Sequence, residues 1–405
     1  MVDKPLPFLA TALGGLLLTL PAIAQNNHKS YGPGVSDAEI TIGQTMPYSG
    51  PASAYGTIGK ADAAYIAMIN DHGGINGRKI NLISLDDSYS PPRTVEQTRK
   101  LIEEDHVLLD FNPLGTPTNT AIQRYLNEHK VPQLFVATGA TKWGDPKRFP
   151  WTMGWQPTYQ IEGRLFAKYL FESKPDAKVG VLYQNDDYGK DYLKGLRNGL
   201  GDKASKMIVR ALSYETSDTT VDSQIISLQS SGADVFYDIT TPKFAAQAIS
   251  EVHDIGWKPL HYLNTVSASV SAVLKPAGLD KSIGLVTAEY LKDPTDPQWR
   301  DDTAYKEWTA WMTKYYPDGD RADAFNVYGY SVTATLVEVL KQCGDDLTRA
   351  NVMKQAEHLD FDAPLLLPGV KVHTTPTDFF PINEMQLAKF DGKTWQRFGQ
   401  VLAMK

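Results

Sequence analysis

Cysteine is almost absent from this sequence, because Cys343 is the only one among its 405 residues. An intramolecular disulfide is therefore impossible, and so is a metal site built from several cysteines. The fold must be held together by its hydrophobic core, and a chain of this length buries enough apolar surface for that. Since Cys343 falls late in an apolar, helix-like pattern, we interpret it as a small core residue and not as a nucleophile.

Signatures of common enzymes are missing as well. The sequence has no G-x-x-x-x-G-K-[ST] phosphate loop, no G-x-S-x-G nucleophile motif and no H-E-x-x-H zinc motif. Its eight histidines are scattered, and none pairs with a neighbouring carboxylate at a spacing suited to a metal. We therefore expect a protein that is not an enzyme and that uses neither a cofactor nor a metal.

Positive charge is not in excess either, since the formal net charge is −7 and like charges do not cluster. An acidic surface repels polyanions, which argues against a nucleic-acid partner and against binding to an anionic membrane.

Long apolar runs are absent apart from one short run at the N-terminus, in MVDKPLPFLATALGGLLLTLPAIAQ. Lys4 precedes an apolar centre from Phe8 to Leu20, and Pro21 and small residues follow. This order predicts a cleavable secretory signal over residues 1–25. A membrane anchor is the alternative, but the apolar centre is shorter than the roughly 20 residues that a spanning helix needs. We expect an exported protein that is soluble outside the cytoplasm.

Strand-like and helix-like segments alternate from Ile40 onward. EITIGQTM, KINLISLDD and VLLDF have β-rich patterns, whereas TIGKADAAYIAMIND and NTAIQRYLNEHK place apolar residues at helical spacing. Such alternation predicts an α/β fold with parallel sheets that helices cover on both faces. A second run of alternation follows the irregular segment FPWTMGWQPTY, so we predict two doubly wound lobes.

Two neighbouring strand-to-helix connections combine small residues with short hydroxyls. In open α/β sheets, ligands bind beyond the carboxyl ends of the strands, where such connections lie. A helix N-terminus adds unsatisfied N–H donors and a partial positive charge, and can therefore bind a carboxylate without lysine or arginine. Alternatively, Thr118 caps its helix and Gly115 only makes a turn. The two connections are FNPLGTPTNTAIQRYL, with Gly115 and Thr116, and ATGAT, with Thr138, Gly139 and Ala140.

The second run of alternation offers further polar connections. QNDDYGKD contains Tyr188, and DITTPKF contains Thr241. The strand-like LHYLN is followed by a segment that contains Asn264. By the same argument on strand ends, we predict that Tyr188 and Thr241 face the ligand site from the second lobe, and we add Asn264 as a candidate ligand-binding residue.

Several of these stretches resemble a known family in order and spacing. They resemble the substrate-binding proteins of branched-chain amino-acid type ABC transporters, the leucine/isoleucine/valine-binding protein family. The resemblance covers nearly the whole mature chain and implies a type I periplasmic-binding fold, in which two α/β lobes with parallel sheets close about a hinge. The stretches are ITIGQTMPYSGPASAYG, INDHGGINGRKINLISLDDSYSPPRTVEQTRKLIEED, GTPTNTA, ATGAT and VGVLYQNDDYGKDYLKGL.

The resemblance also implies an organisation and partners. We expect lobe 1 to comprise residues 36–156 and 288–375, and lobe 2 to comprise residues 157–287 and 376–405. The expected protein is a periplasmic monomer that binds a small-molecule carboxylate and delivers it to the membrane permease of an ABC importer. A sensory protein that presents its ligand to a receptor without transport is an alternative.

The resemblance further implies roles for single residues. Gly115, Thr116, Thr138, Gly139 and Ala140 match the family's carboxylate-binding positions, while Tyr55, Tyr188 and, less closely, Phe325 match its aromatic contacts.

One departure from the family concerns the ligand's amine. Amino-acid binders hold the ammonium with an acidic residue after the strand that here reads HYLNTVSASV, a segment without any acid. Burying an ammonium without a counter-charge is costly, so we expect a carboxylate that lacks the amine, with an aromatic or hydroxy acid favoured. Tyrosine-rich connections suit an aromatic ring. Alternatively, Asp238 or Glu289 supplies the charge, and the ligand is a branched-chain or other amino acid.

Overall fold

The computed structural model describes residues 1–4 and 29–403. Most of the predicted signal peptide, residues 1–25, lies outside the described residues and stays a prediction. Among the helices that the structure does describe, none is both long enough and apolar enough to cross a membrane.

The first sheet has five strands in the order β3-β2-β4-β5-β6, and all of its pairings are parallel. Strands and helices alternate along this part of the chain as predicted. We call the first sheet together with its helices lobe 1. The elements are β2 (Glu39–Met46), α1 (Gly56–Asp71), β3 (Lys79–Asp86), α2 (Pro91–Arg99), β4 (Asp110–Phe111), α3 (Thr116–Glu128), β5 (Gln133–Val136) and β6 (Thr152–Gly154).

The second sheet has seven strands in the order β16-β15-β11-β10-β9-β7-β8, and with its helices it forms lobe 2. The pairings among β7 to β11 are parallel. The elements are α4 (Tyr159–Ser173), β7 (Val179–Gln184), α5 (Asp187–Leu200), α6 (Ala204–Met207), β8 (Ile208–Tyr214), α7 (Asp222–Ser230), β9 (Val235–Ile239), α8 (Pro242–Asp254), β10 (Leu260–Leu263), α9 (Lys275–Ala277), β11 (Val286–Glu289), β15 (Glu384–Phe390) and β16 (Trp395–Ala403).

The last two strands depart from the predicted parallel arrangement. β15 pairs antiparallel with β11 and with β16. The connection between β15 and β16 is a short turn, and parallel neighbours would need a crossover of a dozen or more residues. The α/β class and the two lobes are confirmed, and a C-terminal hairpin extends the second sheet.

The chain returns to lobe 1 between β11 and β15. There α11 packs along α1, and β12 pairs with the N-terminal β1. β11 continues in the second sheet to Glu289, past the boundary expected at residue 288. The division into domains stays a prediction. The elements are β1 (Ser30–Tyr31), α10 (Thr303–Tyr315), α11 (Ala324–Cys343), β12 (Asp346–Leu347), α12 (Arg349–Ala356), β13 (Asp360–Phe361) and β14 (Val372–His373).

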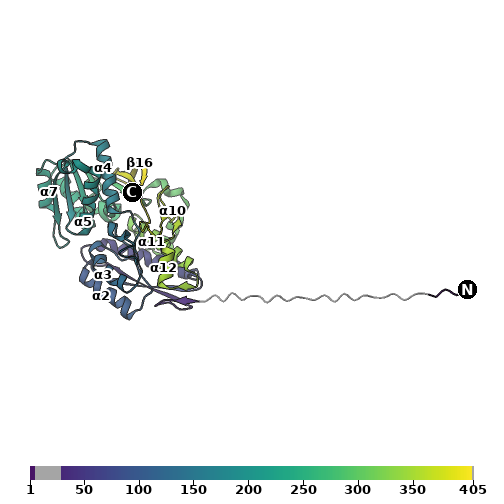
Figure 1. The fold of residues 1–405 in the computed structure, drawn as a ribbon. Coiled ribbons are helices and arrows are strands. Elements are labelled where there is room, and N and C mark those ends of the chain that lie inside the picture. The colour runs from purple at the N-terminus through teal and green to yellow at the C-terminus, as the bar shows by residue number, and fades with distance from the viewer. Residues whose placement is uncertain (5–28, 404–405) are drawn as a thin grey trace.

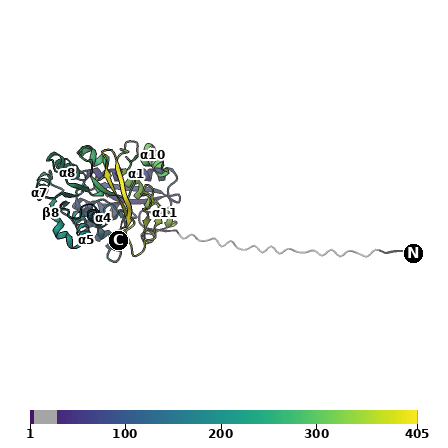
Figure 2. The same ribbon diagram turned by 90° about the horizontal axis from the view of Figure 1, so that it is seen from above.

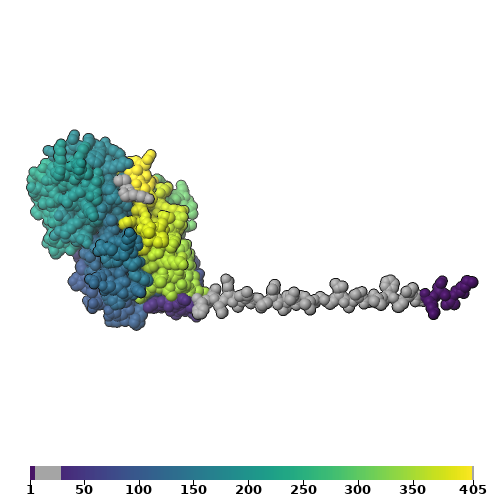
Figure 3. Space-filling model, viewed as in Figure 1, coloured from purple at the N-terminus to yellow at the C-terminus, as the bar shows by residue number. Residues whose placement is uncertain are grey.

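The figures show how the lobes sit together. In Figure 1, α2 and α3 of lobe 1 lie below α4, α5 and α7 of lobe 2. Figure 2 shows the yellow C-terminal strand between the helices of lobe 2 and α10 and α11, and in Figure 3 the yellow-green C-terminal segments lie against both lobes. One cluster of buried hydrophobic residues runs through both lobes, and Cys343 belongs to it, as predicted.

Close packing of α4 against α5 positions the aromatic side chains near the junction. A Cβ atom on Gly163 would lie 2.6 Å from the Leu196 nitrogen, and one on Gly195 would lie 2.5 Å from the Gln160 Cα. Only glycine allows the helices to approach this closely. As a result the ring of Tyr159, at the start of α4, stacks on a ring of α5.

Candidate ligand-binding cleft

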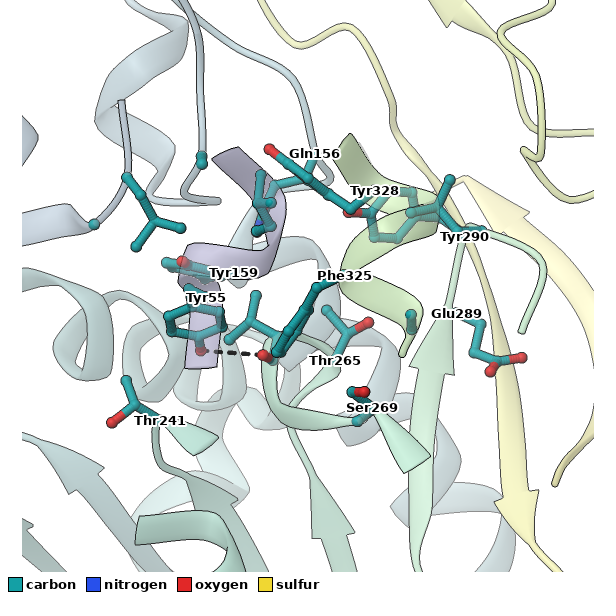
Figure 4. A pocket seen from close by; sticks show the side chains of 18 of the residues that line it. Tyr55, Gln156, Tyr159, Thr241, Thr265, Ser269, Glu289, Tyr290, Phe325 and Tyr328 are labelled. Atoms are coloured by element: carbon teal, nitrogen blue, oxygen red, sulfur yellow. Dashed lines mark hydrogen bonds between the residues drawn. The ribbon is translucent and has the colours of Figure 1, made fainter. Parts of the chain in front are cut away.

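A cleft of about 920 Å³, including the part open to solvent, lies between the two lobes. Lobe 1 lines it with Tyr55, Gly115 and Thr116, and lobe 2 lines it with Tyr188 and Thr241. Segments that connect the lobes complete the walls. Figure 4 shows Gln156 and Tyr290 from these segments beside Phe325 and Tyr328 of α11.

Gly115 sits at the start of α3 in a conformation that other residues rarely adopt, with φ +102°. A Cβ atom there would lie 2.5 Å from the Tyr89 ring. Among the described side chains, none caps α3; the Thr118 hydroxyl donates back to the Leu114 and Gly115 carbonyls. The alternative in which Thr118 caps the helix is therefore wrong. Pro117 has no N–H, so the Thr116 and Thr118 N–H groups are the donors at the start of α3 that have no acceptor inside the helix.

The Thr116 hydroxyl lies against that of Thr138, with 2.6 Å between the oxygens. The Thr138 oxygen also accepts from the Tyr159 hydroxyl at 3.1 Å and from the Trp143 indole N–H at 3.3 Å. Either hydroxyl of this pair can be the donor. When Tyr159 and Trp143 occupy the two lone pairs of Thr138, Thr138 donates its own proton to Thr116. The Thr116 proton can then be donated into the cleft.

Two aspartate caps place the aromatic residues on the opposite walls. The Asp186 carboxylate accepts from the Tyr188 N–H at 2.9 Å, which fixes Tyr188 in the first turn of α5. The Asp323 carboxylate accepts from the Phe325 N–H at 3.0 Å at the start of α11. The Phe325 ring lies 5.0 Å from that of Tyr55. The cleft thus has apolar ring faces between its polar groups.

The Tyr159 and Tyr188 hydroxyls stay protonated at neutral pH and can therefore donate hydrogen bonds. Burial raises the pKa of Tyr159 to about 12 and the pKa of Tyr188 well above its usual range. The Tyr188 hydroxyl is buried and has no hydrogen-bond partner among the described residues. A buried donor without an acceptor is costly, and because Tyr188 lines the cleft its hydroxyl is available to a ligand atom there.

Acidic and basic groups are distributed unevenly around the cleft. Among its described lining residues Lys292 alone is basic, and its ammonium is 2.7 Å from Asp302. Asp238, one of the two possible counter-charges, is bound to His261 and Thr240 and does not line the cleft. Glu289, the other, does line it.

The comparisons with known proteins agree with this architecture. Residues 39–394 match the sequence profile described as periplasmic binding protein. The chain belongs to this family. The resemblance inferred from the motifs is thereby confirmed, together with the type I periplasmic-binding fold.

Relatives in sequence include Leu/Ile/Val-binding protein homolog 1 of Brucella abortus, which is 26% identical over 78% of this chain and 83% of the relative. A branched-chain amino-acid ABC transporter protein from Thermus thermophilus with bound valine superposes with a TM-score of 0.81 at 15% identity, over 91% of this chain and 98% of that one. A fatty acid ABC transporter substrate-binding protein from Thermomonospora curvata gives 0.79 at 22% identity, over 93% and 95%.

The remaining predicted site residues lie behind the cleft wall. Thr138 supports Thr116, and the Ala140 N–H donates to Thr138 at 3.3 Å. Gly139 leaves room for its neighbours, since a Cβ atom there would lie 2.8 Å from the Tyr159 ring. The Asn264 amide donates to the Asp238 and Thr240 carbonyls and so shapes the end of β9.

Several lining residues were not predicted. Tyr89 follows a strand in the stretch DDSYSPP, so its position could have been recognised by the argument on strand ends. Gln156, Tyr159 and Tyr290 belong to the segments that cross between the lobes. The aromatic residues in these segments could have drawn attention to them. The local sequence pattern does not, however, indicate that a segment connecting the lobes faces the cleft.

Direct contacts join the lobes across the cleft. The Tyr55 hydroxyl donates to the Val266 carbonyl at 3.0 Å, drawn as a dashed line in Figure 4. Beside the cleft, the Thr141 N–H and hydroxyl both donate to the Asp191 carboxylate at 2.8 Å. The described conformation is therefore one in which the lobes touch.

Proposed function

We propose that this protein is an extracytoplasmic solute-binding protein that captures a small carboxylate and delivers it to the permease of an ABC importer. The observation that supports this most is the convergence of unused donors on one end of the cleft. These donors are the N–H groups at the start of α3, the Thr116 hydroxyl and the buried Tyr188 hydroxyl.

A carboxylate suits this set because all of its members donate and none is a cation. Hydrogen bonds to an ionised acceptor contribute about 1.5–3 kcal/mol each. Because they are directional, several of them also select for the geometry of a carboxylate, which a single cation would not do. The partial positive charge at the helix N-terminus adds to them. The only basic lining residue among those described, Lys292, is already paired with Asp302.

The binding mechanism is closure of the lobes, without any bond made or broken. The carboxylate first docks on lobe 1 at Thr116, and Tyr188 of lobe 2 then completes its hydrogen bonds. Closure also forms the bond from Tyr55 to the Val266 carbonyl. In this proposal the protein acts as a periplasmic monomer.

The ligands of two structural neighbours agree with a carboxylate. One holds valine and another serves fatty acids. These ligands share a carboxylate and little else. A cleft that binds the carboxylate at one end, and whose other end differs between family members, would accommodate both.

For the remainder of the ligand we favour an aromatic or hydroxy acid. The segment after β10 has no acidic residue, whereas the Tyr55 and Phe325 rings, which are tilted and pack against each other at 5.0 Å between their centroids, give the cleft an aromatic wall. An amino acid is the second candidate, because Glu289 lines the cleft and could receive an ammonium that the ligand carries far from its carboxylate.

A thermal-shift screen tests the proposal. The panel contains leucine, valine, phenylpropionate, phenyllactate and octanoate, with phenylpropionamide as the matched compound that lacks the charge and has an NH₂ group in place of one carboxylate oxygen. A ligand at a hundredfold its Kd stabilises the fold by about 2.7 kcal/mol, which such a screen detects. We expect phenyllactate or phenylpropionate to give the largest shift and the amide to give none. A shift from the amide as large as that from the acid would contradict the proposal.

A further inference from the structure

Glu289 is a buried acid without a partner. It ends β11, lines the cleft and is only 8% exposed. Within the described part of the chain, its carboxyl group makes no hydrogen bond and no ion pair. Nearby Asp293 differs, because it accepts from Thr295 and from Thr394. A polar side chain buried in this way is costly unless something completes it.

The neighbouring charged groups do not complete Glu289. Burial and the charges of Asp293 and Asp296 raise the pKa of Glu289 well above its usual range, and the Arg397 charge opposes this rise only in part. The Arg397 guanidinium donates to Gln386 and Gln298 instead.

Glu289 lies far from the proposed carboxylate-binding site at Thr116 and Tyr188. Tyr188 follows β7, and β11 is three strands away from β7 in the sheet order. Neighbouring strands are about 4.8 Å apart, so these two strands are separated by about 14 Å. In Figure 4, Tyr55 and Tyr159 lie on one side of the cleft and Glu289 lies on the other, with Phe325 between them. The cleft therefore has two polar ends and an apolar middle.

We propose that the cleft takes an elongated, two-ended ligand: a carboxylic acid whose far end carries a hydrogen-bond donor that Glu289 accepts. This inference rests on the proposed function, because the carboxylate end fixes the orientation. The donor is a hydroxyl or an ammonium group, and both present N–H or O–H protons to the same carboxyl group. An α-amino acid would place its amine beside its carboxylate and would leave Glu289 without a partner.

Calorimetry with three acids of equal chain length tests the inference. They are octanoate, its ω-hydroxy derivative and its ω-amino derivative. We expect the wild-type protein to bind at least one donor-tipped acid about ten- to a hundredfold more tightly than octanoate, since a hydrogen bond to a charged or buried acceptor is gained. Equal affinity for all three acids, or no binding of any of them, would overturn the inference.

Variants locate the effect. Glu289→Leu should abolish the preference while keeping the affinity for octanoate. Glu289→Gln, whose amide oxygen still accepts, should keep part of the preference for the hydroxy acid and lose that for the amino acid. Glu384→Gln, on the neighbouring strand β15 and outside the cleft lining, is the matched control and should behave like the wild type. A preference that survives in Glu289→Leu would also overturn the inference.

Two further readouts separate the possibilities. An ammonium group that binds Glu289 should displace the proton from its carboxyl group. The buffer takes up this proton, so the measured heat of binding should depend on the buffer. A hydroxyl group should displace no proton, and the heat should then be the same in every buffer. Thr116→Val should weaken all three acids by a similar factor. If Thr116→Val does not weaken the binding of the three acids, the proposed carboxylate site at Thr116 is wrong. If Thr116→Val weakens all three but Glu289→Leu does not change the preference, only the two-ended ligand is wrong.

Discussion

The Thr116→Val variant gives a sharp prediction, because valine keeps the branched shape of threonine and replaces the hydroxyl with a methyl group that cannot donate. If that hydroxyl donates to the ligand carboxylate, its loss removes one charge-assisted hydrogen bond of about 1.5–3 kcal/mol. The corresponding rise in Kd is about ten- to 150-fold. Thr138 also loses the acceptor for its proton, but it does so in the free and the bound protein alike. That cost therefore reduces stability and cancels in the affinity.

The assay is isothermal titration calorimetry with phenylpropionate or with the acid that gives the largest thermal shift. Thr120→Val is the matched control: the Thr120 hydroxyl donates to the Thr116 carbonyl on the same helix and does not line the cleft. The control should keep the wild-type Kd within about twofold, a difference of about 0.4 kcal/mol. The double variant Thr116→Ala and Thr138→Ala should lose about 2–5 kcal/mol of binding free energy. An unchanged Kd in Thr116→Val would refute the reasoning.

Three further predictions concern the backbone, closure and pH. Gly115→Ala should lower the free energy of unfolding, measured in urea, by about 2–4 kcal/mol. Gly201→Ala is the control and should lower it by about 1 kcal/mol, because Gly201 also has a positive φ but a Cβ atom there would meet no described atom within 4 Å. Tyr55→Phe removes the bond to the Val266 carbonyl, so small-angle scattering should show a larger open fraction without ligand; an unchanged profile would contradict this. Burial raises the pKa of Glu162 to about 8, so its contribution to stability is present below its unfolded pKa and is lost as pH rises through about 8. Wild type should accordingly lose more stability than Glu162→Gln between about pH 5 and pH 8 in urea titrations, and parallel losses would rule this out.

The sequence predicted the lobes well because the alternation of strands and helices depends on local periodicity. Gly115, Thr116, Tyr188 and Thr241, which line the cleft, were predicted from strand ends and helix starts, which are local features. Tyr55 and Phe325, which also line it, were predicted from the resemblance to the family. The antiparallel β15 and β16 were missed because the direction of a strand depends on its connection and on its partner in space.

Other parts of the site could not be predicted from local patterns. Whether Thr138 faces the ligand or supports Thr116 depends on the side chains of Trp143 and Tyr159, which reach it from other segments. Glu289 was considered only as a substitute for a missing charge. Its lack of a partner is visible only once the neighbouring acids and cations have been placed in three dimensions.

The most direct test of the account is a crystal structure of the protein with a bound carboxylate. The account predicts that the carboxylate oxygens lie within hydrogen-bonding distance of the Thr116 hydroxyl, the first N–H groups of α3 and the Tyr188 hydroxyl. A complex in which those oxygens contact Lys292 or an arginine, or in which the acid lies away from the start of α3, would contradict it.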